Sequence, residues 1–446
     1  MRTALLLAVV AAGAPAEHAR ATTYFVRQTV GKDTNDGHTP ATAWEHVSLL
    51  GPILRAGDTA YVGPGLYREQ VSLETDGTPE QRITLIADPT GQHTGDPPGV
   101  VMLTGAEPVD EAAFTKQDAP GVYATTFLPF EVWGVVEMDG PQTRYLRVVT
   151  TSEYLNDHVA PLDVVAKLPS SYHFDPQTHV LTVHTSDGAA PATHELELLR
   201  RAAGVYLVGR HYVTVVGFTF RHMQDAGISF FKGTSDGIAL GNTSWGSRQG
   251  IRVYGAKNIL VSGNTLFRNE NSGVYFAAES TNGVTIGNVA YENVKGLRWS
   301  SQSSYGIASG NVAFDNTERG ISIENVDGMI LRDNILANNA VSQLLVLQCT
   351  YSATDDCFAN GNPQQLVADF TPFPFSDRFP TLAAYQAARH QDLNAREGAC
   401  GALPAKLDVH RLHAETTGYA ERARAVLAGT APAATHRGWL DWLLGR

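Results

Sequence analysis

The feature that most constrains this chain of 446 residues is an internal repeat of about 23 residues. Each unit begins with a glycine followed by an apolar residue, and the steps between units are 23, 23, 23, 23 and 24 residues. The units start at Gly204, Gly227, Gly250, Gly273, Gly296 and Gly320. A unit this short cannot bury an apolar face alone, so the series predicts units that stack on one another.

Each unit contains three short runs in which apolar and polar residues alternate. In the unit that starts at Gly250 these runs are 251–254, 258–261 and 265–267. Alternation with a period of two is typical of a strand with one buried face. No helix and no hairpin turn separates the runs, so each strand is expected to pair with its copy one unit later. The sequence therefore predicts an all-β, right-handed parallel β-helix with three sheets.

A column of asparagines supports this register. The asparagines recur at one corner of successive units, at Asn242, Asn264, Asn288, Asn311 and Asn334. Such a column can be a ligand site, or a ladder whose side-chain amides bond to one another and to the bent backbone. We favour the ladder.

The first residues predict export from the cytoplasm. Arg2 precedes a short apolar stretch, and Ala19-Arg20-Ala21 supplies small residues for cleavage before Thr22. We therefore expect a signal peptide at 1–21 and a secreted or periplasmic mature protein. No apolar stretch approaches the roughly 20 residues that a membrane-spanning helix needs, so no membrane insertion is expected.

The rest of the chain flanks the repeat. A helix at 44–55 is expected to cap the open N-terminal end, and further helices are expected at 381–391 and 419–427. The predicted segments after the signal peptide are an N-terminal cap with the first coils (22–104), a small antiparallel β insert (105–200), the regular coils (201–348) and a C-terminal cap or tail (349–446).

Charge and cysteine content limit the function classes. The formal net charge is −12, which disfavours nucleic acid as a partner. In an oxidising compartment the three cysteines can form one disulfide, and pairing of Cys357 with Cys349 or with Cys400 is compatible with the sequence. The histidines show no metal-binding spacing, so no metal site is expected.

Several short strings resemble those of secreted β-helix enzymes that act on carbohydrates. They are Asp33-x-Asn-Asp-Gly, then Ala-Trp, Gly-Asp-Thr and Pro-Gly-x-Tyr in the N-terminal segment, and Phe174-Asp175-Pro176 with a Leu181-Thr-Val strand in the insert. The layout of residues 22–340 resembles β-helix glycoside hydrolases of the β-xylosidase and α-fucosidase/xylanase type, within the pectate-lyase-like superfamily. The resemblance implies a fold and a carbohydrate substrate, but fold does not determine chemistry.

The repeat predicts which side chains face outward. In the strand that opens each unit, the second and fourth residues after glycine alternate with the buried ones. These two columns form a strip of arginine, tyrosine and serine, and aromatic and guanidinium groups suit sugar binding. The predicted substrate-binding residues are Arg252, Tyr254, Tyr275, Arg298 and Ser300.

Glycoside hydrolysis needs two carboxyl groups. Glu324 is the acid in the outward columns and is the first catalytic candidate, while Glu270, Glu292 and Asp315 lie in the turn that leads into the same strand. Glu292 and Asp315 are one coil apart, which predicts a coupled pair with one raised pKa. In the β-xylosidase-like pattern an aspartate precedes the glutamate by one coil, and here that position is Ser300.

Two alternatives use the same fold. A polysaccharide lyase would act on a uronate-containing glycan by β-elimination, with Arg252, Arg298 or Tyr254 near the substrate and Ca²⁺ as a cofactor. A non-catalytic glycan-binding or surface protein would need neither. The sequence favours a monomeric glycoside hydrolase that acts on a polysaccharide or oligosaccharide and requires no cofactor.

Overall fold

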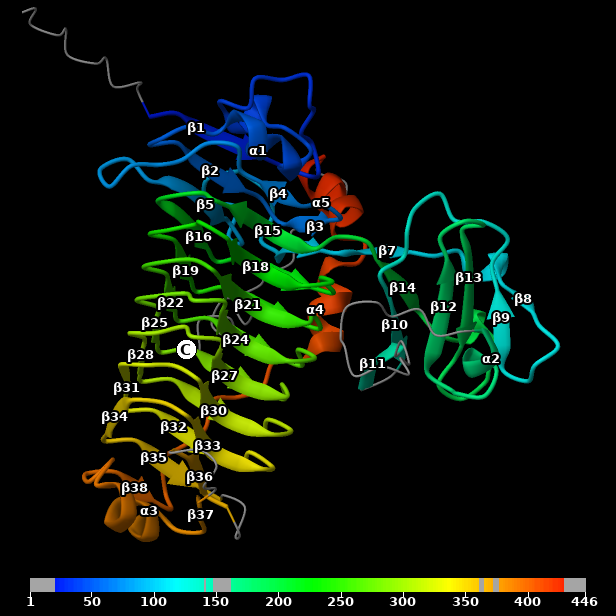
Figure 1. Ribbon diagram of the computed structural model, residues 1–446. Coiled ribbons are helices and arrows are strands. Elements are labelled where there is room, and N and C mark those ends of the chain that lie inside the picture. The colour runs from blue at the N-terminus through cyan, green and yellow to red at the C-terminus, as the bar shows by residue number, and fades with distance from the viewer. Residues whose placement is uncertain (1–20, 140–141, 147–161, 361–364, 372–376, 429–446) are drawn as a thin grey trace, which may run out of the picture.

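The computed structural model describes residues 21–139, 142–146, 162–360, 365–371 and 377–428. These residues form an elongated stack of β coils with a smaller β unit attached to its side (Figure 1). The predicted signal peptide, apart from Ala21, lies outside the described residues. In the described part of the chain, no helix combines the length and apolar character that crossing a membrane requires.

Three sheets of ten strands run the length of the stack. Sheet A contains β1 (Thr23–Val26), β2 (Thr59–Val62), β5 (Ile83–Ala87), β16 (Val213–Val216), β19 (Ile238–Leu240), β22 (Leu260–Ser262), β25 (Val284–Ile286), β28 (Ile307–Ser309), β31 (Met329–Arg332) and β34 (Tyr351–Thr354). Sheet B contains β3 (Gly65–Tyr67), β6 (Val101–Thr104), β17 (Thr219–Arg221), β20 (Thr243–Trp245), β23 (Thr265–Phe267), β26 (Val289–Tyr291), β29 (Val312–Phe314), β32 (Ile335–Ala337), β35 (Cys357–Ala359) and β38 (Arg396–Glu397). Sheet C contains β4 (Val71–Ser72), β15 (Ala203–Val208), β18 (Ala226–Phe231), β21 (Gln249–Tyr254), β24 (Ser272–Ala277), β27 (Lys295–Trp299), β30 (Arg319–Glu324), β33 (Ser342–Leu347), β36 (Val367–Phe370) and β37 (Asp377–Phe379).

The predicted parallel β-helix is confirmed, and so is its register. Arg252 pairs with Tyr275, and Tyr275 with Arg298, each one coil further along sheet C. Repeat glycines are needed because the backbones of neighbouring coils approach closely here: a Cβ at Gly250 would lie 2.5 Å from the carbonyl oxygen of Gly273. The three sheets continue past residue 348 through β34, β35 and β36, so the coils extend beyond the predicted boundary.

The asparagine column is a buried ladder, as predicted. The Nδ2 atom of Asn264 donates to Oδ1 of Asn288 at 2.9 Å, and the backbone nitrogen of Asn264 donates to the same oxygen at 3.0 Å. A second ladder, which the sequence analysis did not identify, runs along another corner. Its members are Asn269, Asn293, Asn316 and Asn339.

The N-terminal cap is less helical than predicted. Trp44 is bridged to Val26 in extended conformation, so the helical part is limited to a 3₁₀ turn, η2 (Val47–Leu49), and α1 (Leu50–Ile53). Leu50 and Leu54 are fully buried in the end of the stack. Other short 3₁₀ turns are η1 (Pro40–Thr42), η3 (Glu111–Ala113) and η4 (Pro191–Thr193).

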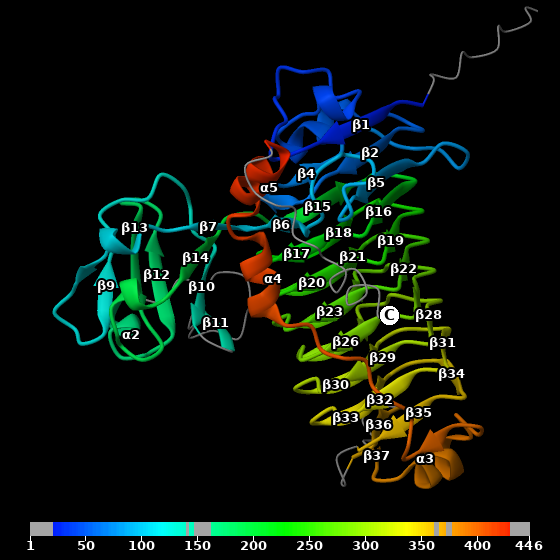
Figure 2. The ribbon, with the colours of Figure 1, turned by 180° about the vertical axis from the view of Figure 1, so that it is seen from behind.

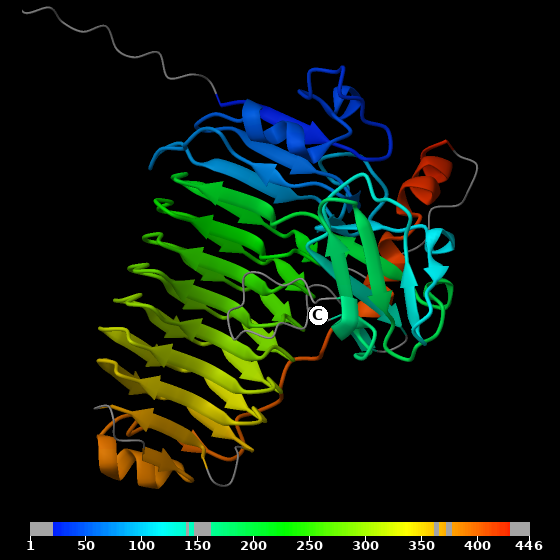
Figure 3. The same cartoon turned by 45° about the vertical axis from the view of Figure 1, so that its right-hand side comes forward.

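The insert consists of two four-stranded antiparallel sheets. One sheet has the order β11-β10-β14-β7 and the other β12-β13-β9-β8. Its elements are β7 (Ala106–Pro108), β8 (Thr115–Lys116), β9 (Val122–Ala124), β10 (Gly134–Asp139), β11 (Gln142–Leu146), α2 (Leu162–Val165), β12 (Ser171–Asp175), β13 (Val180–His184) and β14 (Leu196–Leu199). The insert lies beside the coils (Figure 3). Glu197 of β14 forms a buried ion pair of 2.7 Å with Arg221 and a hydrogen bond of 2.6 Å with Nδ1 of His222, which anchor the insert to the coils.

The chain does not end at the last coil. After α3 (Leu382–Arg389), residues 401–428 run back along the outside of sheet B towards the first coils (Figure 2). We call this segment the C-terminal strap; it contains α4 (Val409–Thr416) and α5 (Tyr419–Leu427). A disulfide between Cys357 and Cys400 attaches its start to β35, and Cys349 is a free, buried thiol.

Candidate functional site

The predicted outward strip lies on the outer face of sheet C. We use the name sheet C face for the outward side chains of β18, β21, β24, β27 and β30 together with the turn residues that bond to them. At its centre Arg298 holds Glu324 through two hydrogen bonds, from Nε to Oε1 at 3.2 Å and from Nη2 to Oε2 at 2.7 Å. The two residues are diagonal neighbours because Arg298 pairs in register with Ser322, two residues before Glu324.

The surroundings of Glu324 keep it ionised. Ser322 donates its hydroxyl to Oε1 of Glu324 at 2.6 Å, and the Glu324 side chain is only 15% exposed. Burial acts to raise the pKa of Glu324, but the hydrogen bonds and charge of Arg298, with Ser322 and Lys295, lower it overall. A half-buried carboxylate of this kind can act as a base or nucleophile, but it is a poor proton donor.

A second carboxylate joins this group from the preceding turn. Glu318 forms ion pairs of 3.0 Å with Lys295 and 2.7 Å with Arg319. Burial acts to lower the pKa of Arg298, but Glu324 and, to a smaller extent, Tyr275 and Glu318 raise it overall. Lys295 and Arg298 therefore lie between two carboxylates, Glu318 and Glu324.

The tyrosine of the central coil lies beside this ion pair. The hydroxyl groups of Tyr275 and Ser300 are 3.1 Å apart, and the guanidinium of Arg298 lies over the Tyr275 ring at 5.0 Å. Ser300, at the position that the family pattern gives to an aspartate, therefore bonds to a phenol. Part of the ring surface expected to stack on sugar is used to hold Arg298 in place.

A similar arrangement occurs two coils earlier. Arg252 pairs with Asp225 at 2.6 Å and lies over the Tyr254 ring at 4.4 Å and the Phe231 ring at 5.1 Å. The Phe231 and Tyr254 rings are stacked, with centroids 5.2 Å apart. The Nε of Arg252 has no hydrogen-bond partner in the described part of the chain, whereas the Nε of Arg298 is bonded to Glu324.

Unpartnered polar atoms gather on this face. Six side chains on or beside sheet C have a buried polar atom without a hydrogen-bond partner among the described residues; they are Asp225, Ser229, Gln249, Arg252, Arg319 and Ser342. Burying a polar atom without a partner costs free energy. These atoms have almost no exposed surface, so the groups that a ligand can reach on the sheet C face are its partly exposed arginine, lysine and tyrosine side chains.

The other predicted acids lie elsewhere, at the corner between sheets B and C. Glu270 and Glu292 line a cavity of about 250 Å³ together with Trp245, Arg268 and Thr317. Tyr172 of the insert lies close enough for the charge of Glu270 to raise its pKa further, after burial. The structure therefore separates Glu270, Glu292 and Asp315 from Glu324.

Glu292 and Asp315 are stacked as predicted, but a cation lies between them. Lys406 of the strap contacts Glu292 at 2.8 Å and Asp315 at 2.6 Å, and Arg268 also bonds Glu292 at 2.7 Å. Burial opposes ionisation of Glu292, but Lys406 and Arg268 outweigh it and lower its pKa. The predicted raised pKa is wrong for Glu292, because the sequence did not show that the strap supplies Lys406.

Comparisons with known proteins support the fold. Residues 180–360, less than half of the chain, match the model of a family described as periplasmic copper-binding protein (NosD). Among curated proteins, no sequence matches this chain significantly.

Similar solved structures are β-helix proteins with low sequence identity. XylC in complex with xylose is 16% identical, with a TM-score of 0.52 over 80% of this chain and 72% of that one. A rhamnogalacturonan lyase is 12% identical (TM-score 0.46; 76% and 74% covered), and a GH136 lacto-N-biosidase from Eubacterium ramulus is 11% identical (0.42; 85% and 67%). The predicted resemblance to β-helix carbohydrate-active enzymes is confirmed as a likeness of fold.

The residues that the structure describes do not fit a copper site. Copper prefers histidine, cysteine and methionine ligands. In the described part of the chain, no group of three or more His, Cys, Asp or Glu side chains is arranged to hold a metal. Cys357 is in the disulfide, and His222 is fully buried against Glu197.

Proposed function

We propose that this protein is a secreted or periplasmic carbohydrate-active enzyme that hydrolyses glycosidic bonds on the sheet C face. The observation that carries the proposal is the ionised, half-buried Glu324, held by Arg298 and Ser322 among aromatic and hydroxyl groups. XylC, which shares the fold, is described in complex with xylose, and that description is consistent with a sugar as ligand.

Glu324 would act as the nucleophile or as the base that activates water. Both roles need an ionised carboxylate at the moment of attack. Arg298 supplies that state, and its two-point contact also fixes the orientation of the carboxylate. The pair is nearly neutral overall, so an uncharged sugar ring can approach it.

Glu318 is the proposed second carboxylate. It is joined to Glu324 electrostatically through Lys295 and Arg298. In hydrolysis the second group protonates the leaving oxygen. Movement of both the Lys295 ammonium and the Arg319 guanidinium away from Glu318 on substrate binding would allow Glu318 to carry that proton.

Arg252 and its neighbours would bind a further sugar unit. Neighbouring strands are about 4.8 Å apart, so the Arg252 coil lies roughly 10 Å from the Arg298 coil. Asp225 balances the charge of Arg252, and the stacked Phe231 and Tyr254 rings beside it are partly exposed. This combination favours an uncharged, hydroxylated sugar at this position.

A lyase is the second candidate, because Tyr275 and Arg298 share the same face. In that case the Tyr275 phenol would take or return a proton while Arg298 contacts a uronate carboxylate. Metal dependence separates the two: a hydrolase of the proposed kind keeps its activity in a chelator, whereas a Ca²⁺-dependent lyase loses it.

The test is a panel of neutral and uronate-containing polysaccharides, assayed for new reducing ends and for absorbance of an unsaturated product. We expect reducing ends without the absorbance. Glu324→Gln should lower the rate by about 10²–10⁴-fold, because the amide cannot act as a base or nucleophile. Glu279→Gln, at an exposed turn of the same solenoid, is the matched control and should retain full activity.

The role of Glu318 as proton donor is tested by the dependence of the rate on the leaving group. Glu318→Gln should be slow on natural glycosides but recover rate on aryl glycosides whose leaving group needs no proton.

Full activity of Glu324→Gln with unchanged melting would remove Glu324 from the mechanism. Unsaturated product would establish a lyase, and binding without turnover on the whole panel would establish a glycan-binding protein.

A further inference from the structure

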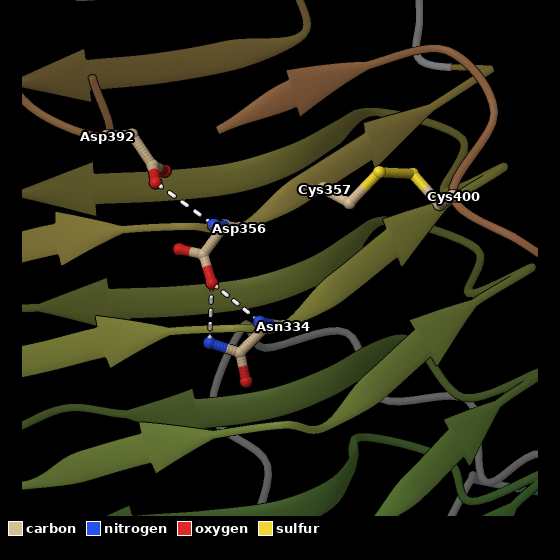
Figure 4. The surroundings of a disulfide bond; sticks show 5 residues. All are labelled: Asn334, Asp356, Cys357, Asp392 and Cys400. Atoms are coloured by element: carbon tan, nitrogen blue, oxygen red, sulfur yellow. Dashed lines mark hydrogen bonds between the residues drawn. A yellow bond between two sulfur atoms is a disulfide. The ribbon is translucent and has the colours of Figure 1, made fainter. Parts of the chain in front are cut away.

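The asparagine ladder does not end in an asparagine. At the next coil its place is taken by Asp356, whose Oδ1 accepts hydrogen bonds from the backbone nitrogen of Asn334 at 2.7 Å and from its Nδ2 at 2.9 Å (Figure 4). The backbone nitrogen of Asp356 in turn donates to Oδ1 of Asp392 at 3.2 Å. Two carboxyl groups therefore occupy consecutive rungs of a ladder that is otherwise made of amides.

The preceding asparagines of the ladder indicate the hydrogen-bonding role of the second oxygen of Asp356. In the preceding rung, Nδ2 of Asn334 donates both to the next side chain and to the carbonyl oxygen of Ala308, at 2.9 Å each. One coil on, Leu331 is in register with Ala308, and Asp392 supplies the next side-chain oxygen. In each asparagine of the ladder, Nδ2 donates to acceptor oxygens. The second oxygen of Asp356 takes the place of that Nδ2. If it were ionised, it would face only the partial negative charges of those acceptors.

Nothing nearby compensates two negative charges. Asp356 and Asp392 are each 1% exposed, and neither forms an ion pair with any described residue. Of the charged neighbours, Asp355 is exposed and would add repulsion, while Arg396 is exposed and contacts Asp356 only through its backbone nitrogen. Glu397 accepts a hydrogen bond from the backbone of Leu382, at the start of α3.

We propose that Asp356 keeps its proton at neutral pH and acts as an asparagine mimic, so that a pH-sensitive hydrogen bond fastens the C-terminal cap to the last coils. The proton lies on the outer oxygen of Asp356 and is shared with Asp392. Burial and Asp392 raise the pKa of Asp356 to about 8. Burial and the charge of Asp355 raise the pKa of Asp392 to about 6, while its hydrogen bonds with Asp356 act to lower it, which agrees with a proton held on Asp356.

The fastening weakens as the pH rises. A carboxyl group whose pKa is higher in the folded protein favours folding most at low pH, where both states hold the proton. Between the ordinary value of 3.8 and about 8 the unfolded chain ionises while Asp356 does not, so stability falls across this window. Above about pH 8, Asp356 is ionised in both the folded and the unfolded state, and it no longer donates a hydrogen bond to Asp392. The segment concerned leads from α3 through Asp392 to β38.

The test compares Asp356→Asn with the wild type and with Asp355→Asn, the exposed neighbour. The asparagine supplies the two donor hydrogens without a titratable group. We expect its Tm to exceed that of the wild type by about 2 °C or more at about pH 9, with a smaller difference at about pH 5. Infrared difference spectra should show the carbonyl band of a protonated acid at about pH 7 in the wild type and in Asp355→Asn, but not in Asp356→Asn.

Asp392→Asn is the second variant, since its amide can donate to an ionised Asp356 and should also flatten the pH profile. Parallel pH profiles of wild type and both variants, with no acid band assignable to Asp356, would overturn the proposal. If Asp356→Asn fails to fold while Asp392→Asn keeps the steep wild-type profile, the proposal is likewise wrong.

Discussion

The outer faces of sheets B and C are built from the same coils, but they carry opposite chemistry. On sheet B, an outward column of aromatic rings is stacked along the solenoid, with 4.9 Å between the centroids of Phe267 and Tyr291 and 5.2 Å between those of Tyr291 and Phe314. On sheet C the corresponding outward column alternates arginine with tyrosine and serine. The strap covers the outer face of sheet B (Figure 2).

The outer face of sheet B is suited to packing within the chain, and the outer face of sheet C is suited to binding a ligand. The sheet B rings form an apolar cluster with Val409 and Leu412 of the strap, so their exposure would cost free energy without the strap. The sheet C face is half-buried and rich in ion pairs, so a polar ligand suits it better than an apolar cover. An aromatic residue in an outward column is thus not by itself evidence of a sugar platform.

The strongest way to break the comparison is to weaken the cover of sheet B. Leu412→Ala should lower the free energy of unfolding by about 2–5 kcal/mol, because a buried leucine leaves a cavity against the aromatic column. Leu427→Ala, at a leucine that is 43% exposed in α5, should cost less than about 0.5 kcal/mol. Denaturant titration measures both. Enzymatic rate at low temperature should be unchanged, and a loss of rate in Leu412→Ala without loss of stability would contradict the separation.

A smaller effect concerns the ion pair on sheet C. Arg298→Met removes the charge that lowers the pKa of Glu324, while burial remains and raises it. In the wild type, the Glu324 carboxylate stays ionised as the pH falls below the ordinary pKa of 4.5. In Arg298→Met, it should become protonated at a higher pH than in the wild type. The acid limb of kcat/KM against pH should therefore move upward. An unmoved limb would show that Glu324 does not control it; Arg332→Met, at an exposed position on sheet A, is the control.

The smallest expected effect is at the edge of the strap. Lys406 is 39% exposed, so solvent screens its contacts with Glu292 and Asp315. Lys406→Met should change stability by less than about 1 kcal/mol, and less at high salt. Lys257→Met, on the exposed surface of the coils, serves as the reference. A cost as large as that of Leu412→Ala would mean that charge, rather than apolar packing, holds the strap.

The repeat explains why much of the fold was predictable. A regular spacing fixes both the pairing and the direction of each side chain, so the neighbours Arg252, Tyr275 and Arg298 followed from counting. The second asparagine ladder has the same spacing and was equally visible in the sequence. The strap has no period, and its position depends on contacts with strands more than 100 residues away, such as the hydrogen bond from Leu407 to Tyr291.

The site was predictable only in part, for the same reason. The outward columns brought Arg298 and Glu324 together, because both belong to the repeat. The corner acids and Arg268 also belong to it, but Lys406 does not. Lys406 and Arg268 together lower the pKa of Glu292, whereas a raised pKa was predicted for one member of the Glu292–Asp315 pair. The disulfide was likewise undetermined, since Cys400 follows a strand, β38, that returns to β35 after a long excursion.

The strap also affects the order in which the protein can reach its native state. Helices α4 and α5 follow in sequence every strand that they cover, and α5 reaches back to the first coils, where Tyr419 bonds to Pro97 and Arg424 to Thr29. A nascent chain that has formed its coils but lacks this segment exposes a continuous aromatic stripe. Such a stripe promotes association between chains. The risk of association during folding therefore ends only when residues 401–428 have been synthesised and have packed against sheet B.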